Sequence, residues 1–210
     1  GELVADVILI LAQNPGTNHP RMLASLEVAK KRGARIIAIN PLKEVGLIRF
    51  VHPQEPMAIL RNGTALADLY LQVRINGDVA LLQGLARCLL AQDAVDHDFL
   101  AAHTSGCAEY RNHVRAADWD LIVRESGIER AQIEQAAALL ASSRGTVACW
   151  AMGLTQHENA VDNIRELTNL LLLGGHIGRR NAGLFCVRGH SNVQGDRTMG
   201  IAEHMPETFY

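Results

Sequence analysis

Two continuous apolar runs stand near the start of the chain. Residues 3–12 are almost entirely aliphatic and lead directly into the turn-forming residues 13–18. Residues 35–39 form a second run, which ends at Asn40 and Pro41. Short aliphatic runs bounded by turn residues are typical of strands that are buried on both faces. The pattern therefore predicts two buried strands.

The segment between these runs has helical spacing instead. Its apolar residues recur every three or four positions, Pro20 suits a first helical turn, and Gly33 suits the residue after a helix end. Asn18 is predicted to be the N-cap of this helix. A helix that joins two buried strands predicts a right-handed βαβ unit with parallel strands.

Further elements follow with the same alternation. No regular period is found over residues 41–65, a short strand is predicted over 69–73, and a helix is predicted to begin at Gly77 and Asp78. Helical spacing then continues through residues 96–143. Within that stretch, helices are expected at 98–103, 108–116, 120–125 and 129–141.

The last third of the chain begins with another predicted strand, over residues 146–151. A polar turn is expected at 153–156 and a long amphipathic helix at 158–173. The glycine-rich residues 174–210 are expected to be a loop-rich tail. Together these elements predict one α/β domain over residues 1–210, with three layers, a mainly parallel, Rossmann-like sheet and a helical insert at about 96–143.

Charge and composition exclude several classes of partner. The chain carries 20 Lys and Arg against 22 Asp and Glu, a net charge of −2, with no polybasic tract. A protein that binds duplex nucleic acid by neutralising phosphates would need an excess of basic residues. Aromatic residues amount to only 4%, and no apolar run has the length of a membrane span. We therefore expect no nucleic-acid partner and no membrane segment.

The cysteines carry no metal or disulfide signature. Cys88, Cys107, Cys149 and Cys186 include no C-x-x-C pair, so they are interpreted as buried thiols of a reducing compartment, and we expect a cytoplasmic protein. The pairs His103/Cys107 and Cys186/His190 have helical spacing, but neither has a matching second pair. No metal site is predicted within this chain.

The first residue is Gly1, and neither an initiator methionine nor the pattern of a signal peptide follows. The chain is therefore interpreted either as a processed protein or as a piece of a longer one.

Polar clusters follow each predicted strand. They are residues 14–18, Asn40, residues 76–78 and residues 152–156. Because ligands of parallel sheets bind beyond the carboxyl ends of the strands, these clusters are candidates for phosphate, ribose and base contacts. The alternative is that such residues merely form turns. A nicotinamide site is disfavoured, because G-x-G-x-x-G is absent and Asn40 replaces the usual acidic residue.

The densest polar cluster is residues 187–195 in the tail. Arg188, with Gly189 beside it, has the chemistry to hold a carboxylate or phosphate through two parallel hydrogen bonds. The alternative, that this arginine caps helix carbonyls in a tight loop, is equally compatible with the spacing.

Several motifs resemble one family, the molybdopterin oxidoreductases of the DMSO-reductase superfamily. The resemblance covers nearly the whole chain and is closest to the formate-dehydrogenase-like branch. The segments that carry it are N-P-G-T-N-H-P at 14–20, A-K-K-R-G-A-R-I-I at 29–37, N-P at 40–41, W-A-M-G-L-T-Q at 150–156 and V-R-G-H-S-N-V-Q-G at 187–195.

The resemblance implies a large enzyme that holds molybdenum or tungsten between two molybdopterin guanine dinucleotides and contains a 4Fe-4S cluster. This chain would be a central fragment that binds one dinucleotide and is inactive alone, because the cysteine cluster and the metal-ligating residue precede it in the family. The full enzyme would carry out the two-electron oxidation of a small anion such as formate, with an electron-transfer partner that the sequence does not identify.

The resemblance also implies roles for individual residues. Asn14, Thr17 and Asn18 would meet phosphates; Asn40 and Leu42 would border the nucleoside; Asp78, helped by Gly77, would bind guanine; Met152, Gly153 and Gln156 would line the pterin side; and Arg188, Gly189 and His190 would lie near the metal and substrate.

Three positions differ from the family pattern. Asn40-Pro41-Leu42 stands where many members carry Asp-Pro-Arg, and His190 stands where formate dehydrogenases have glutamine. Two other functions stay open beside the enzyme domain. One is a non-catalytic nucleotide-binding or assembly domain of the same fold, and the other is an NAD-dependent dehydrogenase domain.

Overall fold

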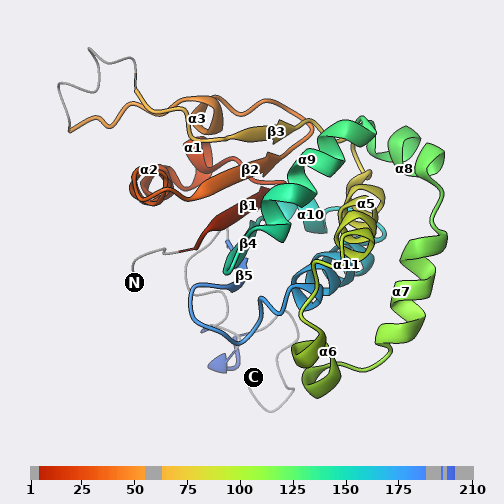
Figure 1. Cartoon of the computed structure of the whole chain (residues 1–210). Coiled ribbons are helices and arrows are strands. Elements are labelled where there is room, and N and C mark those ends of the chain that lie inside the picture. The colour runs from red at the N-terminus through yellow and green to blue at the C-terminus, as the bar shows by residue number, and fades with distance from the viewer. Residues whose placement is uncertain (1–4, 55–62, 188–194, 196–197, 202–210) are drawn as a thin grey trace, which may run out of the picture.

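The computed structural model describes residues 5–54, 63–187, 195 and 198–201. At its centre lies a five-stranded sheet in which every pair of neighbouring strands is parallel, in the order β3-β2-β1-β4-β5 (Figure 1). The strands are β1 (Val7–Leu11), β2 (Arg35–Ile39), β3 (Leu69–Leu71), β4 (Thr146–Trp150) and β5 (Gly183–Cys186). The predicted α/β class with a parallel sheet is confirmed.

The central strands are aliphatic throughout because helices cover both faces of the sheet. In β1, Leu9 and Leu11 belong to one core cluster, whereas Ile8 and Ile10 belong to the other. All five residues of β1 are buried. Successive side chains of a strand point to opposite faces, so a strand between two helical layers needs apolar residues at every position.

Helices form the two outer layers (Figure 1). The first core cluster includes residues of α5 (Asp78–Ala91), α9 (Arg130–Ala141) and α11 (Ala160–Leu173), and the second includes residues of α2 (Pro20–Lys31) and α3 (Val45–Ile48). The other helices of the described residues are α1 (Pro15–Asn18), α6 (His97–His103), α7 (Cys107–Ala116), α8 (Trp119–Ser126) and α10 (Met152–Thr155). No helix in the described ranges is both long and apolar enough to cross a membrane.

Five local predictions differ from the structure. The cap of α2 is His19, because Asn18 already closes the short helix α1. Residues 45–48 form α3, although 41–65 was expected to be irregular, and most of the predicted turn at 153–156 is the helix α10. The tail contributes the edge strand β5, and Cys186 at its end is exposed rather than buried.

The strand order fixes where a ligand site is expected. The chain adds β2 and β3 on one side of β1, and then crosses to add β4 and β5 on the other side. The carboxyl ends of β1 and β4 therefore flank the point where the connections diverge to opposite sides. Open parallel sheets bind their ligands in the crevice at this point.

Candidate functional site

A cavity of about 380 Å³ lies at this crevice. Its lining comes from the segments that follow β1, β2, β3 and β4. The predicted site residues that line it are Asn14, Asn18, Asn40, Leu42, Asp78, Gly153 and Gln156. Polar clusters that are far apart in the sequence therefore meet at one place, as predicted.

Other predicted residues lie elsewhere. Thr17, Gly77 and Met152 are not part of the cavity lining. Gly77 has a packing reason to be glycine, since a Cβ there would lie 2.7 Å from the Glu125 carbonyl oxygen. The segment with Arg188, Gly189 and His190 lies outside the described residues, so their proposed positions near a metal stay predictions.

Asn14 forms hydrogen bonds that stabilise the loop after β1. Its side-chain oxygen accepts a hydrogen bond from the Thr17 main-chain N–H at 3.0 Å, and its main-chain oxygen accepts one from the Asn18 N–H at 3.0 Å. Its amide nitrogen donates to the carboxylate of Glu44. The Thr17 and Asn18 N–H groups are thus already bonded within the loop, and the Glu44 carboxylate lies beside Asn14.

Asn40 joins the ends of β1 and β2. Its side-chain oxygen accepts a hydrogen bond from the Gln13 main-chain N–H at 3.0 Å, and its side-chain nitrogen donates to the Gln13 carbonyl at 2.7 Å. The side chain is almost fully buried. An amide has two donor hydrogens and two acceptor lone pairs. The second donor of Asn40 reaches the Tyr70 hydroxyl, so an acceptor lone pair remains for a ligand.

Asp78 is the most unusual polar residue of the cavity. It stands in the first turn of α5 and is only 4% exposed. Within the described residues, no ion pair or hydrogen bond from another side chain reaches its carboxylate. Burial raises the pKa of Asp78 above its usual value, although the nearby His157 and the residue's own main chain partly oppose the shift. A buried carboxylate that receives a hydrogen bond from its own main chain but none from a neighbouring side chain is costly, and a ligand can supply further donors.

Gln13 is a cavity residue that the sequence analysis did not single out. Its side-chain nitrogen donates to the Met22 sulfur at 2.9 Å, while its side-chain oxygen is buried without a partner among the described residues. That oxygen leaves an acceptor for a ligand or a water molecule. Only the polarity of residue 13 at a strand end pointed to it.

Two cavity residues adopt left-handed backbone conformations that favour glycine. They are Ala12, with φ 48°, and Asn76, with φ 66°. Gly153 packs directly on the first of them, since a Cβ at this glycine would lie 2.7 Å from the Ala12 carbonyl oxygen. Backbone strain of this kind is often concentrated at functional sites. The close contact brings the loop after β4 against the loop after β1.

The charged side chains of the cavity are mixed in sign. Glu44 and Asp78 are acidic, and Arg74 supplies one guanidinium, which donates to the Arg124 carbonyl at 2.7 Å. No group of three or more histidine, cysteine or acidic residues in the described part of the chain could hold a metal ion. The arrangement is suited to binding a ligand with several N–H donors rather than to acid–base or metal chemistry.

The sequence of this chain is similar to parts of longer known proteins. An uncharacterized oxidoreductase of Mycobacterium tuberculosis is 52% identical over 211 residues, which cover 98% of this chain and 27% of that protein. Formate dehydrogenase H of Escherichia coli is 29% identical over 204 residues, which cover 97% of this chain and 26% of that enzyme. This chain therefore spans about a quarter of the length of these relatives. No family model matches the sequence.

Among solved structures, acetylene hydratase from Pelobacter acetylenicus has the same fold. Its TM-score is 0.66 at 22% sequence identity, and the match covers 81% of this chain and 21% of that one. The likeness shows that the five-stranded parallel domain also occurs as part of a much larger protein.

Proposed function

We propose that this chain is the domain of a molybdenum or tungsten oxidoreductase that binds one molybdopterin guanine dinucleotide, with the guanine base at Asp78. The observation that carries the proposal is the buried Asp78 carboxylate, which receives no hydrogen bond from another described side chain and lines the cavity at the diverging strands. The resemblance of the motifs and the similarity to formate dehydrogenase H support it.

The nucleoside end of the ligand fits the residues present. Guanine offers two neighbouring N–H donors, and a carboxylate accepts such a pair through its two oxygens. Leu42 and Ile75, which are 69% and 79% exposed, supply apolar surface beside the cavity. Burying such side chains against a flat base is favourable. Asn40 keeps one acceptor lone pair for a ribose hydroxyl.

The phosphates of the dinucleotide fit less well with Asn14 and Thr17, which were predicted to contact them. Glu44 contacts Asn14, and a carboxylate repels a phosphate. We therefore assign Asn14 and Thr17 to the structure of the loop. Arg74 is the described cavity residue with a full positive charge, and we propose it as the phosphate contact instead.

For the whole protein we propose a formate-dehydrogenase-like oxidation of a small anion, with Arg188 and His190 holding that anion. A 4Fe-4S cluster is proposed for the full-length enzyme, outside this chain. When bound, the metal and its pterins would carry the two-electron transfer, while this chain would bind and orient the cofactor. The oxidoreductase names of the relatives support this reaction class.

Calorimetric titration of the chain with GDP and with NAD tests the proposal. We expect GDP to bind and NAD not to bind. Asp78→Asn should weaken GDP binding by about 1–3 kcal/mol, because a neutral amide presents a donor to the donors of guanine. Asp162→Asn is a matched control, since Asp162 also stands in the first turn of a 14-residue helix but is exposed. Binding of NAD alone would favour the dehydrogenase alternative.

A further inference from the structure

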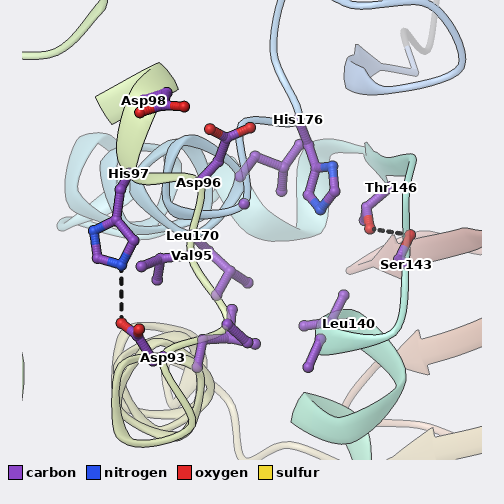
Figure 2. A pocket seen from close by; sticks show the side chains of 15 residues that line it. Asp93, Val95, Asp96, His97, Asp98, Leu140, Ser143, Thr146, Leu170 and His176 are labelled. Atoms are coloured by element: carbon purple, nitrogen blue, oxygen red, sulfur yellow. Dashed lines mark hydrogen bonds and ion pairs between the residues drawn. The ribbon is translucent and has the colours of Figure 1, made fainter. Parts of the chain in front are cut away.

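A second cavity, of about 520 Å³, lies beside the amino end of β4 (Figure 2). Thr146, the first residue of β4, is part of its lining, so this cavity is at the opposite edge of the sheet from the Asp78 site. Its size is typical of sites for small molecules. The cavity shares no lining residue with the proposed nucleotide site.

The ends of three long helices surround this second cavity. It is lined by residues at or just beyond the carboxyl ends of α5, α9 and α11, which have 14, 12 and 14 residues. The carboxyl end of a helix carries a partial negative charge. α6, whose amino end also faces the cavity, is capped by Asp96, whose oxygen accepts the Phe99 N–H at 2.9 Å. The helix ends therefore favour a positively charged ligand.

The side chains add further negative charge. Asp93, Asp96 and Asp98 line the cavity, and no lysine or arginine is found among its described lining residues. Two cations lie close by. Arg179 pairs with Asp96 at 2.6 Å, and Arg111 contacts the His97 ring at 3.3 Å. Arg179 thus offsets Asp96, and Asp93 contacts His97 Nε2 at 2.9 Å (Figure 2). The remaining negative charge of the lining rests on Asp93 and Asp98, whose side chains are exposed at its rim.

His176 provides a polar group inside this acidic cavity. The side chain is 7% exposed and its imidazole points into the cavity (Figure 2). The Nδ1 atom is buried without a hydrogen-bond partner among the described residues. Burial, followed by the nearby Arg179, lowers the pKa of His176, while Asp96 and Asp6 oppose the shift. At neutral pH the ring therefore has one donor and one acceptor nitrogen.

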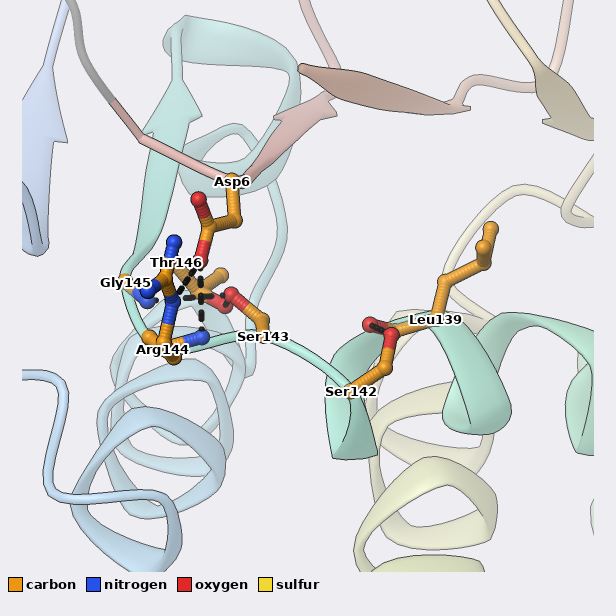
Figure 3. A network of polar contacts seen from close by, with 7 residues as sticks. All are labelled: Asp6, Leu139, Ser142, Ser143, Arg144, Gly145 and Thr146. Atoms are coloured by element: carbon orange, nitrogen blue, oxygen red, sulfur yellow. Dashed lines mark hydrogen bonds and ion pairs between the residues drawn. The ribbon is translucent and has the colours of Figure 1, made fainter. Parts of the chain in front are cut away.

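Hydrogen bonds fix one side of this cavity, and apolar side chains form another part of its lining. Hydrogen bonds from Thr146 Oγ1 at 3.0 Å and from the Gly145 N–H at 3.2 Å hold Ser143, and Asp6 accepts the Arg144 N–H at 3.0 Å (Figure 3). The apolar lining includes Leu89, Val95, Leu140, Leu170 and Leu171. A short hydrocarbon chain would be buried against these residues.

We propose that this cavity binds a small organic cation, an ammonium group on a short aliphatic chain, with the His176 imidazole as a hydrogen-bond acceptor and the aspartates as counter-charges. The ammonium supplies the donor that the buried ring lacks, and the leucines bury the aliphatic part. A bare metal ion is not the ligand we infer, because the described residues offer no cluster of three metal-binding side chains. The proposal does not depend on the function of the Asp78 site.

The test uses n-butylammonium as the probe, with 1-butanol and butyrate as neutral and anionic controls of similar shape. The imidazole 15N signals of the intact chain are followed at pH 7.5 during titration. We expect saturable shifts of His176 with n-butylammonium alone and no change at His113, which is exposed on α7. Equal shifts with butanol or butyrate, or no shift with any probe, would overturn the proposal.

Two variants localise the binding. Val95→Trp should fill the cavity and abolish the shifts, whereas Val161→Trp, at an exposed valine of α11, should not. Asp98→Asn should weaken binding about threefold, as expected for one partly solvated charge, and Asp120→Asn on α8 should leave it unchanged.

Binding of Nα-acetyl-lysine amide but not n-butylammonium would overturn the small-molecule proposal in favour of a polypeptide lysine. Undiminished binding in Val95→Trp would also overturn it.

Discussion

The side chain of Asn40 and the main chain of Gln13 exchange two hydrogen bonds, at 3.0 and 2.7 Å. Asn40 directly follows β2, and Gln13 is two residues beyond β1, so this pair ties together the carboxyl ends of the two strands. Both residues line the Asp78 cavity. The crevice is therefore built by a polar contact as well as by the sheet.

Removing this contact should destabilise the protein. Asn40→Ala leaves the buried Gln13 N–H and carbonyl without their partner, and we expect the free energy of unfolding to fall by about 1–3 kcal/mol. Asn40→Asp keeps the acceptor for the N–H but places a carboxylate against the Gln13 carbonyl, so it should also destabilise. Urea denaturation measures both effects. An alanine variant as stable as the wild type would show that the contact contributes nothing.

The ionised Asp78 carboxylate should lower the free energy of unfolding of the chain, although we propose that it binds the ligand. Its pKa is raised in the folded state, so between the usual value of 3.8 and the folded pKa the native chain binds more protons than the unfolded chain. Stability therefore falls as pH rises through this window and stays lower above it. We expect Asp78→Asn to melt at a higher temperature than the wild type at pH 7, with the difference disappearing below pH 3.8. A lower melting temperature at pH 7 would contradict this interpretation.

Gly153 should not tolerate a side chain. A Cβ at this position would lie 2.7 Å from the Ala12 carbonyl oxygen, so Gly153→Ala must push the two loops apart, at a cost of about 1–3 kcal/mol. Gly16→Ala is the matched control in another short helix, since the nearest atom to its Cβ would be 3.4 Å away. Equal thermal stability of the two variants would argue against the close contact.

The four cysteines should differ strongly in reactivity. Cys186 is exposed, whereas burial raises the pKa of Cys149 to about 12 and, together with the nearby Glu134, that of Cys88 to about 11. Because the thiolate is the reactive species, iodoacetamide at pH 7.5 should modify Cys186 first and leave Cys88 and Cys149 intact until the chain unfolds. Peptide mass spectrometry over time gives the order of modification. Early labelling of Cys149 would contradict the buried position.

The sequence was sufficient to predict the helix and sheet layers of the fold and the crevice at the carboxyl ends of the strands. Continuous aliphatic runs identified β1 and β2 because strands buried on both faces need apolar side chains at every position. Parallel strands place their carboxyl ends at one edge, so polar residues after each run were expected to meet, and Asn14, Asn40, Asp78 and Gln156 do line one cavity.

Other features depend on contacts that no local pattern contains. β5 is a four-residue edge strand with two exposed residues, so it lacks the apolar run of a central strand. The hydrogen bond that the Asn14 side-chain nitrogen donates goes to Glu44, which is distant in sequence. The second cavity combines the carboxyl ends of three helices, and only the packing of α5, α9 and α11 brings His176 among the aspartates.

A crystal structure of the chain with GDP bound would test the central claim most directly. The account predicts that the base lies in the cavity at the carboxyl ends of β1 and β4, with its two N–H donors within hydrogen-bond distance of the Asp78 carboxylate oxygens. A base bound elsewhere, or in this cavity with Asp78 contacting only solvent, would contradict it.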